Sequence, residues 1–423
     1  MPRRLLLLLG ASLWLSVVVC GRALPRLLED NSIFGPSKMH QVRVSLSQEE
    51  WDVLQKSGIR GSPGVRGEDY TLSDGRIVHL GGGFGLAFPW VHADLLLNGV
   101  EIKDVGLRFK GNNSFVKPTA AMPLSTNLKV KTDFFGGKSD WNGVETLNFN
   151  FGARDPSAIR EALAFAIFRE AGVPASRTAY AEITFTVPGL HENARAGIFT
   201  IVENVNKQFL KRTLPPGTGL LMKPEGTRGG ILSLGANWSA YIPVYRPERE
   251  ATPHEQQRVI EFAGLVSQPD VVLFREKIGT YLDVDQFLRF VAVNLFIVNG
   301  DSYITGNHNY YLYLDPKDDK FRFIPWDEDL SMAGQRGLNV SQDILRPNAG
   351  NNALIYWLLD DPAVAERYRA IVKELAASVF VAPVLNKMIA DAEQAIPGRD
   401  SSTKTFLINR AAYMQSAVAG MDK

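Results

Sequence analysis

The chain has 423 residues, of which 45% are hydrophobic and 22% charged, and its formal net charge is +1. These values are typical of a globular protein long enough for two domains or lobes with a large core. The balanced charge gives no reason to expect nucleic acid or an anionic membrane surface as a partner.

Residues 1–23 have the pattern of a secretory signal peptide. Arg3 and Arg4 precede an apolar run that is shorter than the roughly 20 residues of a transmembrane helix, and small residues follow it. A lipid anchor at Cys20 is the alternative, but Val19 is too large for the position before such a site. We therefore expect a secreted or cell-envelope protein without a transmembrane segment.

Cys20 is the only cysteine, so removal of the signal peptide would leave a chain without disulfides. Zinc sites built from thiolates are then excluded, and the six histidines show no metal-ligand spacing. The stability of the mature chain must come from its core.

The first elements are a strand over residues 41–47 and a short helix over residues 47–57, with Ser47 and Glu50 as a capping box. Residues 58–85 are rich in glycine and charge and are expected to form a loop. The glycine run at residues 81–85 fails the G-x-G-x-x-G spacing, so it is interpreted as a turn.

A β-hairpin is predicted from strands over residues 91–97 and 103–110, joined around Asn98-Gly99. Its second strand contains Arg108 and continues into Gly111-Asn112-Asn113-Ser114. Glycine lets a ligand approach the backbone, and the Asn and Ser side chains offer donors to phosphate oxygens. An ordinary turn is the alternative interpretation.

The next strand, residues 127–132, places Lys129 and Lys131 on one face. A lysine on such a strand can hold the phosphates of a bound nucleotide. Alternation cannot separate the two lysines, and a solvated strand face is the alternative.

After a strand over residues 141–151, Asp155-Pro156-Ser157 is predicted to start a helix that ends at Ala171. This helix follows the lysine strand, as the regulatory helix does in a kinase. Arg160 and Glu161 are therefore candidates for the ion pair that positions the lysine.

Two more strands, over residues 180–186 and 196–202, lead into Glu203-Asn204-Val205-Asn206-Lys207. Kinases read the adenine with the backbone where a strand leaves the sheet in this way. A short strand over residues 219–223 ends with Lys223.

From residue 252 onward the sequence is mostly helical, so the fold class is α+β rather than alternating α/β. The expected helices span residues 253–266, 270–281, 283–298, 352–380, 382–395 and 401–419, and Pro362 is expected to split the fourth.

The most informative stretch begins with the helix over residues 283–298, which Asn299-Gly300 is expected to end. A polar loop with Asp301, Asn307 and Asn309 follows it. A hairpin over residues 310–325 then leads into a second acidic group.

That second group is Trp326-Asp327-Glu328-Asp329. Carboxylates and amides at these positions suit Mg²⁺ and leave one carboxylate to orient or deprotonate a hydroxyl. The order of elements is that of a protein kinase, although His-Arg-Asp and Asp-Phe-Gly are both missing. The alternative is a surface turn capped by the amides of the preceding loop.

Asn-x-Asn-Tyr-Tyr-Leu-Tyr followed by Ile-Pro-Trp-Asp-x-Asp resembles the signature of the CotH family of spore-coat-protein-H-type atypical kinases. The resemblance implies that Asp301 is the catalytic aspartate and Asp327 the metal-binding one. Asn307, Asn309 and Asp329 would lie near the metal.

Other motifs fall in family order over roughly residues 41–377. Arg108, Gly111, Asn112 and Ser114 are similar to its Arg-x-x-Gly-Asn-x-Ser motif, and Lys129 with Lys131 to its Tyr-Lys-Ile-Lys strand. Asp155, Ser157 and Arg160 fit the Asp-x-Ser-x-x-Arg pattern of the family. Glu203 matches the first residue of its Glu-x-Val-Asp-Lys element, in which Asn206 replaces the Asp, and Lys223 matches a further lysine of the family.

The resemblance implies a two-lobed, protein-kinase-like α+β fold, with an N-lobe-like region at residues 38–250 and a C-lobe-like region at residues 251–423. The expected activity is transfer of the γ-phosphoryl group of ATP to a protein hydroxyl, with Mg²⁺ or Mn²⁺ as cofactor. A non-catalytic surface or adhesion protein on the same fold is the main alternative, and a metal-dependent hydrolase is another.

Overall fold

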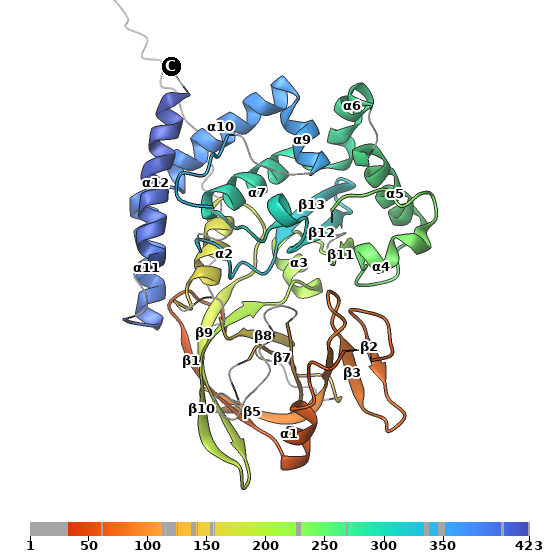
Figure 1. The fold of residues 1–423 in the computed structure, drawn as a ribbon, viewed down its shortest axis with the longest axis vertical. Helices are drawn as coiled ribbons and strands as arrows, with labels where there is room; N and C mark the ends of the chain where they lie inside the picture. The colour runs from red at the N-terminus through yellow and green to blue at the C-terminus, as the bar shows by residue number, and fades with distance from the viewer. Residues whose placement is uncertain are drawn as a thin grey trace, which may run out of the picture.

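The structure is a computed structural model that describes residues 33–60, 62–111, 115, 124, 126–136, 141, 143–152, 155, 157–225, 230–267, 270–333, 338–345, 352–398 and 402–421. The expected signal segment, Asn112 and Ser114 lie outside these residues. Most strands of the first half gather at one end of the molecule, and most helices of the second half lie at the other (Figure 1). The predicted α+β class is confirmed.

Seven of the described strands close into a barrel in the order β1-β5-β6-β7-β8-β10-β9. Their bounds are β1 Met39–Ser45, β5 Val91–Leu97, β6 Val100–Phe109, β7 Leu128–Lys131, β8 Thr146–Asn150, β9 Thr178–Val187 and β10 His191–Glu203. A parallel pairing of β1 with β9 closes the barrel, and the other pairs are antiparallel. Alternate side chains, such as Val42 and Val44 of β1, fill its apolar interior.

The hairpin predicted around Asn98-Gly99 joins β5 to β6. Both turn residues have positive φ, 48° and 85°, as the tight turn between two twisted strands requires. Strand β6 begins at Val100 rather than at residue 103, because pairing continues up to the turn with Leu97 opposite Val100.

The expectation of a loop over residues 58–85 is wrong in part. This segment contains β2 (Asp69–Thr71) and β3 (Ile77–Leu80), which form a small sheet with β4 (Ala87–Pro89). Val78, Leu80 and Ala87 give this sheet a core of its own. The helix before it, α1 (Gln48–Leu54), starts as predicted, because the Ser47 side chain accepts from the Glu50 N–H.

Helix α2 (Arg160–Glu170) begins five residues after the predicted start. The Asp155 carboxylate accepts instead from the backbone N–H groups of Ser157 (3.0 Å) and Arg160 (2.8 Å). Asp155 therefore hydrogen-bonds to the backbone that leads into α2 and does not belong to the helix itself.

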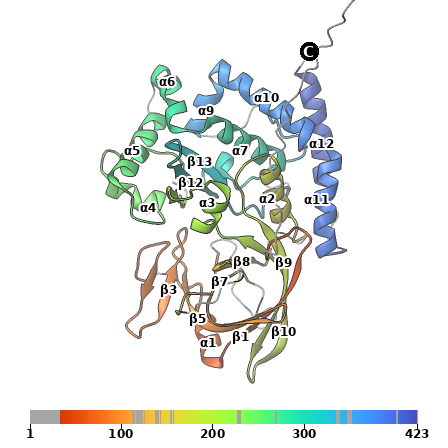
Figure 2. The same ribbon diagram turned by 180° about the vertical axis from the view of Figure 1, so that it is seen from behind.

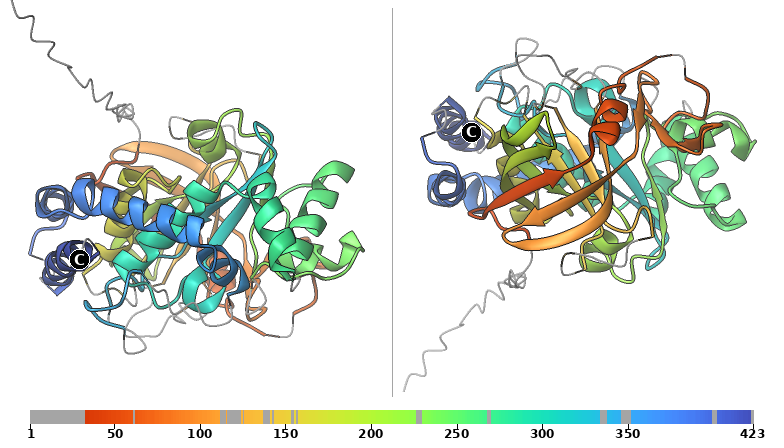
Figure 3. Two further views of the ribbon diagram at one scale, coloured as in Figure 1. Left: turned by 90° about the horizontal axis from the view of Figure 1, so that it is seen from above. Right: turned by 90° about the horizontal axis from the view of Figure 1, so that it is seen from below.

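The remaining described elements are α3 Lys207–Thr213, β11 Leu220–Met222, η1 Trp238–Ala240, α4 Ile242–Tyr245, α5 Pro253–Ser267, α6 Val271–Tyr281, α7 Val284–Ile297, α8 Tyr303–Gly306, β12 Tyr310–Asp315, β13 Lys320–Pro325, α9 Ala353–Leu359, α10 Pro362–Ser378, α11 Ala382–Ala395 and α12 Ser402–Gly420. The predicted break at Pro362 separates α9 from α10, and α11 has its predicted bounds. Figures 2 and 3 show the same arrangement from behind, above and below.

These helices and the sheet β11-β12-β13 share one large apolar cluster, separate from the barrel interior. Helix α2 and strand β11 belong to that cluster although they precede residue 250 in the chain. The boundary between the two cores therefore does not follow a single cut at residue 250.

Helix α7 is buried on nearly all sides and contacts α2, α10 and β13. Asp283 caps its start as predicted, and the helix ends at Ile297, one residue before the expected end at residue 298. Val298 takes the left-handed conformation (φ 52°), and the Met332 N–H donates to the Ile297 carbonyl at 2.7 Å. Tertiary contact thus replaces the glycine that usually ends a helix.

Arg410 of α12 is fully buried and binds the end of α7. Its guanidinium donates to the carbonyl oxygens of Leu295 (2.9 Å), Phe296 (3.2 Å), Val340 (2.7 Å) and Gln342 (2.6 Å). The last-turn carbonyls of a helix lack partners within it, so Arg410 satisfies groups that burial would otherwise leave unpaired.

Within the described ranges, no single helix is long and apolar enough to cross a membrane. The bent pair α10 and α11 meets the length and composition requirements together, with 62° between its helices.

Replacing Arg410 with alanine is expected to lower the free energy of unfolding by about 3 kcal/mol or more, because buried carbonyls lose a charged donor. Urea denaturation followed by circular dichroism measures this loss. Asn409→Ala, at an exposed position of the same helix, should change it by less than about 0.5 kcal/mol. Equal midpoints for the two variants would contradict the assigned role.

Candidate functional site

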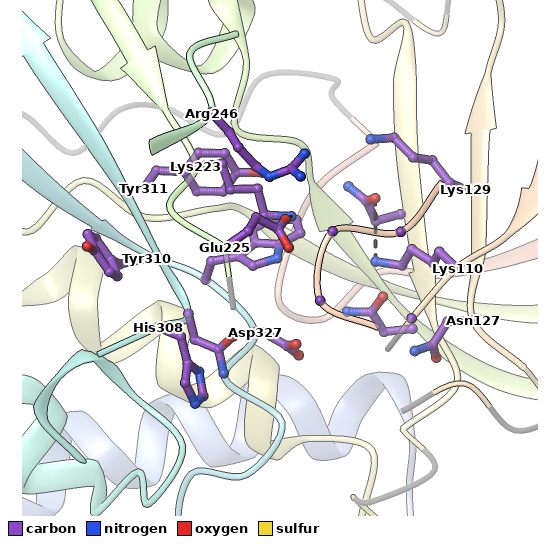
Figure 4. A pocket seen from close by; sticks show the side chains of 18 of the residues that line it. Lys110, Asn127, Lys129, Lys223, Glu225, Arg246, His308, Tyr310, Tyr311 and Asp327 are labelled. Atoms are coloured by element: carbon purple, nitrogen blue, oxygen red, sulfur yellow. Dashed lines mark hydrogen bonds and ion pairs between the residues drawn. The ribbon is translucent and has the colours of Figure 1, made fainter. Parts of the chain in front are cut away.

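A cavity of about 970 Å³ lies where the barrel, the small sheet β2-β3-β4 and the polar turns after α7 and β13 meet. The acidic residues, basic residues and histidines that line it are Arg66, His79, Arg108, Lys110, Lys129, Glu161, Lys223, Glu225, Arg246, Asp301, His308, Asp327 and Asp329. Figure 4 shows Lys110, Asn127 and Lys129 on one side, with Asp327, His308 and Lys223 across from them. We call this cavity the central cleft.

The acidic residues predicted from the sequence meet in the central cleft. Asp301 comes from the turn after α7, whereas Asp327 and Asp329 follow β13. Asp327 has a positive φ of 57° at this turn. Burial raises the pKa of Asp327, Asp301 raises it further, and the positive charge of Lys110 opposes the rise.

Two neighbours hold the Asp301 side chain. The Asn309 amide donates to Asp301 Oδ2 at 3.3 Å and to the Asp301 carbonyl at 2.6 Å. His308 Nε2 lies 3.4 Å from Asp301 Oδ1. The sequence predicted Asn309 here but gave His308 no role.

Four cations line the barrel side and the neighbouring strand edge of the central cleft. Arg108 and Lys129 are paired positions on β6 and β7, Lys110 directly follows β6, and Lys223 follows β11. Burial and the charges of Arg108, Lys223 and Lys110 hold the pKa of Lys129 well below its usual value. Cations held this close favour the binding of an anion with several charges.

Amide side chains position two of these lysines. Lys129 Nζ donates to Asn204 Oδ1 at 3.3 Å, and Lys110 Nζ lies 3.5 Å from Asn148 Oδ1. Asn148 in turn donates to Asn204 at 3.2 Å, so one chain of hydrogen bonds spans both lysines.

Lys110, which the sequence analysis did not select, is attracted by two carboxylates of the central cleft, Glu161 and Asp327. Burial lowers its pKa to about 8, while attraction from Glu161 and Asp327 limits the fall. The side chain of Asn150 donates to both Glu161 oxygens, at 3.0 and 2.8 Å, and burial raises the Glu161 pKa to about 7.

Trp326 packs beside two of the cations. Its ring centroid lies 5.6 Å from Lys110 Nζ and 5.4 Å from Lys223 Nζ. Lys223 also lies 3.2 Å from Glu225, another lining residue that sequence reasoning missed. The tryptophan of the acidic motif therefore contributes an electron-rich face to the cation cluster.

Several predicted site residues lie elsewhere in the described structure. Lys131 extends over the Phe134 ring, 5.5 Å from its centroid, and Asn307 accepts from the Asn352 amide at 2.9 Å. Neither is among the described residues that line the central cleft. Strand alternation had left Lys129 and Lys131 equivalent.

Glu203 and Arg160 are also absent from the described lining of the central cleft. Glu203 is bound by Arg177 at 2.9 Å and Arg212 at 2.6 Å, which makes it part of a buried ion cluster. Arg160 pairs with Asp155 at 3.6 Å, whereas Glu161, the other candidate for the ion pair that positions a lysine, lines the central cleft.

The glycine run that was interpreted as a turn contributes to the wall of the central cleft. Gly111 and the turn Gly81–Gly83 line it. A Cβ atom at Gly82 would overlap the Glu225 carboxylate, so a larger residue there would require the Glu225 side chain to move. In the sequence, only the run of three glycines could have indicated that this turn lines the cavity.

Oxygen donors for a metal ion are present but few. Among the described residues, no three His, Cys, Asp or Glu side chains form a metal-binding group. Asp327, Asp329 and the Asn309 amide nevertheless line one cavity. Magnesium is commonly held by one or two carboxylates together with substrate phosphates, so this donor set fits a metal shared with a polyphosphate.

A protein-family model described as CotH kinase protein matches residues 107–417. Inner spore coat protein H of Bacillus subtilis is 23% identical over 243 residues, which is 57% of this chain and 64% of that protein. Spore coat protein homolog 1 and Invasin CotH7 of Rhizopus delemar are 24% and 22% identical over 53% of this chain. These alignments cover 37% and 38% of the Rhizopus proteins, so the chain spans less than two thirds of each relative.

Two solved structures show weak similarity. A chain of the Shewanella oneidensis toxin–antitoxin complex of HipA, HipB and operator DNA has a TM-score of 0.32 and 12% identity, over 65% of this chain and 57% of that chain. The Helicobacter pylori proinflammatory kinase CtkA has a TM-score of 0.26 and 8% identity, over 66% and 92%. Similarity this low supports no conclusion about the fold or function of this chain.

The raised pKa of Glu161 predicts a pH effect on stability. Between its ordinary value of 4.5 and about 7, the folded state keeps a proton that the unfolded state releases, so stability falls as pH rises through this window. Glu161→Gln should remove this fall, which is at most about 3 kcal/mol.

Thermal unfolding at pH 4.5, 6 and 7.5 measures the difference between wild type and Glu161→Gln. Glu170→Gln, at an exposed position of the same helix, is the control and should follow wild type. A constant difference between wild type and Glu161→Gln across this range would show that Glu161 titrates normally.

Proposed function

Because the chain belongs to the CotH kinase protein family, we propose that it is an atypical kinase that transfers the γ-phosphoryl group of ATP to a protein hydroxyl. The observation that supports this proposal best is the central cleft, which the cations Arg108, Lys110 and Lys129 line together with the carboxylates Asp301 and Asp327. Lys110 and Lys129 lie across the cleft from Asp327 (Figure 4). Phosphoryl transfer needs both: cations for the nucleotide phosphates, and carboxylates for a metal and the attacking hydroxyl.

In this proposal, Lys110 and Lys129 bind phosphate oxygens. The mutual repulsion that lowers the Lys129 pKa would be relieved by a bound polyanion. Glu161 and Asn148 keep Lys110 directed toward the central cleft, and Asn204 does the same for Lys129.

Asp327 and Asp329 are the proposed ligands of Mg²⁺ or Mn²⁺, with Asn309 nearby. When bound, the metal would neutralise phosphate charge and help to orient the γ-phosphoryl group. Because the Asn307 side-chain oxygen accepts a hydrogen bond from the Asn352 amide, Asn307 is a weaker candidate for a metal ligand than the sequence suggested.

Asp301 is the proposed acceptor of the hydroxyl proton. The hydroxyl oxygen forms a bond to the γ-phosphorus as the bond to the bridging oxygen of ADP breaks, and ADP leaves with that electron pair. His308 and Asn309 hold the two carboxylate oxygens of Asp301 during this step.

The same proposal includes a two-lobed, kinase-like organisation, in which the barrel corresponds to the N-lobe and the helical half corresponds to the C-lobe. Secretion or attachment to the cell envelope is also proposed, on the basis of the signal pattern at residues 1–23. The names of the relatives, which include spore coat proteins and an invasin, agree with that location.

Calorimetry with ATP is expected to show binding that depends on Mg²⁺ or Mn²⁺ and that Asp327→Ala weakens by at least about 100-fold, because metal ligation is lost. Asp301→Ala should still bind ATP but lose about 10²- to 10⁴-fold in phosphoryl transfer. Asp52→Ala, an exposed acid on α1, is the control. Absence of ATP binding with either metal would reject the kinase and favour a non-catalytic adhesion module.

A separate prediction concerns the two lysines proposed to bind phosphate. Lys110→Met and Lys129→Met should each weaken ATP binding by about 10-fold or more, since each removes a charge-assisted hydrogen bond to phosphate. Lys131→Met provides the matched control and should bind ATP as wild type does. A loss confined to Lys131→Met would contradict the phosphate contacts proposed here.

A further inference from the structure

Glu328 separates the two acids proposed to bind metal, yet it is 1% exposed and is not among the described residues that line the central cleft. Asp327 and Asp329 face the cleft, whereas the side chain of Glu328 turns back into the protein. An internal carboxyl group needs hydrogen-bond donors, because burial disfavours its charge.

Two donors are present. Glu328 Oε2 accepts from Asn299 Nδ2 at 2.7 Å and from Ser331 Oγ at 3.0 Å. Burial of a carboxyl group costs free energy even with such donors, so stabilisation of the fold alone is a poor explanation for Glu328.

The contact with Asn299 leads directly to Asp301. Asn299 is 3% exposed, and its Oδ1 accepts from the backbone N–H of Asp301 at 2.8 Å. One planar amide thus donates to Glu328 and accepts from Asp301. Because the Glu328 oxygen accepts from the N–H end of this amide, the amide oxygen is left facing the Asp301 N–H.

A second connection runs on the other side of the same turn. The Asn309 amide donates to the Asp301 carbonyl, and the Asn309 carbonyl accepts from the Trp326 N–H at 3.2 Å. The backbone of Asp301 is therefore tied to the segment of Asp327 at both its N–H and its C=O.

We propose that Glu328 is a positioning residue that sets Asp301 relative to Asp327 through the Asn299 amide. This inference rests on the proposed kinase function for its effect on rate, although the hydrogen-bonded link itself can be tested without activity. Misplacement of a catalytic group by about 1 Å can lower a rate by about 100-fold, so a short rigid link is sufficient to matter.

The experiment compares Glu328→Ala and Glu328→Gln in the full chain. Glu328→Ala should lower kcat by about 10- to 100-fold while the KM for ATP changes by less than about 3-fold, because ATP contacts the lysines and not Glu328. Glu328→Gln keeps an oxygen acceptor for Asn299 and should restore kcat to within about 3-fold of wild type.

The matched control is Asn294→Ala. Asn294 is a buried amide of α7 that donates only within its own helix, to the Phe290 carbonyl at 3.0 Å, in the bonds described. It should lose stability without the selective loss of kcat. Equal kcat losses in Asn294→Ala and Glu328→Ala would assign Glu328 a merely structural role and overturn the proposal.

Hydrogen exchange measures the link independently of turnover. The amide of Asp301 should exchange faster in Glu328→Ala and at the wild-type rate in Glu328→Gln. If the wild-type protein transfers no phosphoryl group, the proposed function is rejected. The exchange measurement still tests whether Glu328 holds the Asp301 backbone through Asn299. Unchanged exchange in Glu328→Ala would overturn the link whatever the activity.

If Glu328→Ala does not fold, Asn299→Ala tests the same link. It removes both the donor to Glu328 and the acceptor of the Asp301 N–H. Faster exchange at Asp301 with a reduced kcat is expected. Wild-type exchange and kcat in Asn299→Ala would overturn the proposal.

Discussion

Attraction between Lys110 and the carboxylates of Glu161 and Asp327 is the interaction on which the arrangement of the site depends. Lys110 comes from the barrel, Glu161 from α2, and Asp327 from the turn after β13, so three separate parts of the fold supply its charges. A buried charge without an opposite charge is strongly unfavourable. The barrel, α2 and the β12–β13 hairpin must therefore meet with these side chains facing one another, which also creates the central cleft.

Local signals predicted many elements of the fold. Asn98-Gly99 specifies a hairpin because both residues tolerate positive φ, Ser47 and Asp283 cap helices with their own side chains, and Pro362 breaks a helix because it lacks an N–H. The acids at 301, 327 and 329 were also predictable, since each follows an apolar element at its polar end. These features are set by residues within a few positions of one another.

The features that the sequence did not predict depend on contacts between residues far apart in the chain. Nothing near Lys110 distinguishes it from Lys129 or Lys131, because its partners come from other elements. Glu203 looked like part of a nucleotide-binding strand end, but Arg177 and Arg212 bind it. Helix α7 likewise closes with Val298 in the left-handed conformation, and the Met332 N–H binds a carbonyl of its last turn. Sequence reasoning thus identified the acidic half of the site better than the cationic half.

Closure of the barrel by β1 and β9 has a consequence for any shortened form of the protein. The family model begins at residue 107, inside β6, whereas β1 and β5 lie before that point. A fragment limited to the matched residues would leave the pairing edge of β9 open and remove part of the barrel's apolar interior. Open edges promote association between chains, so the N-terminal strands act as an internal safeguard against aggregation.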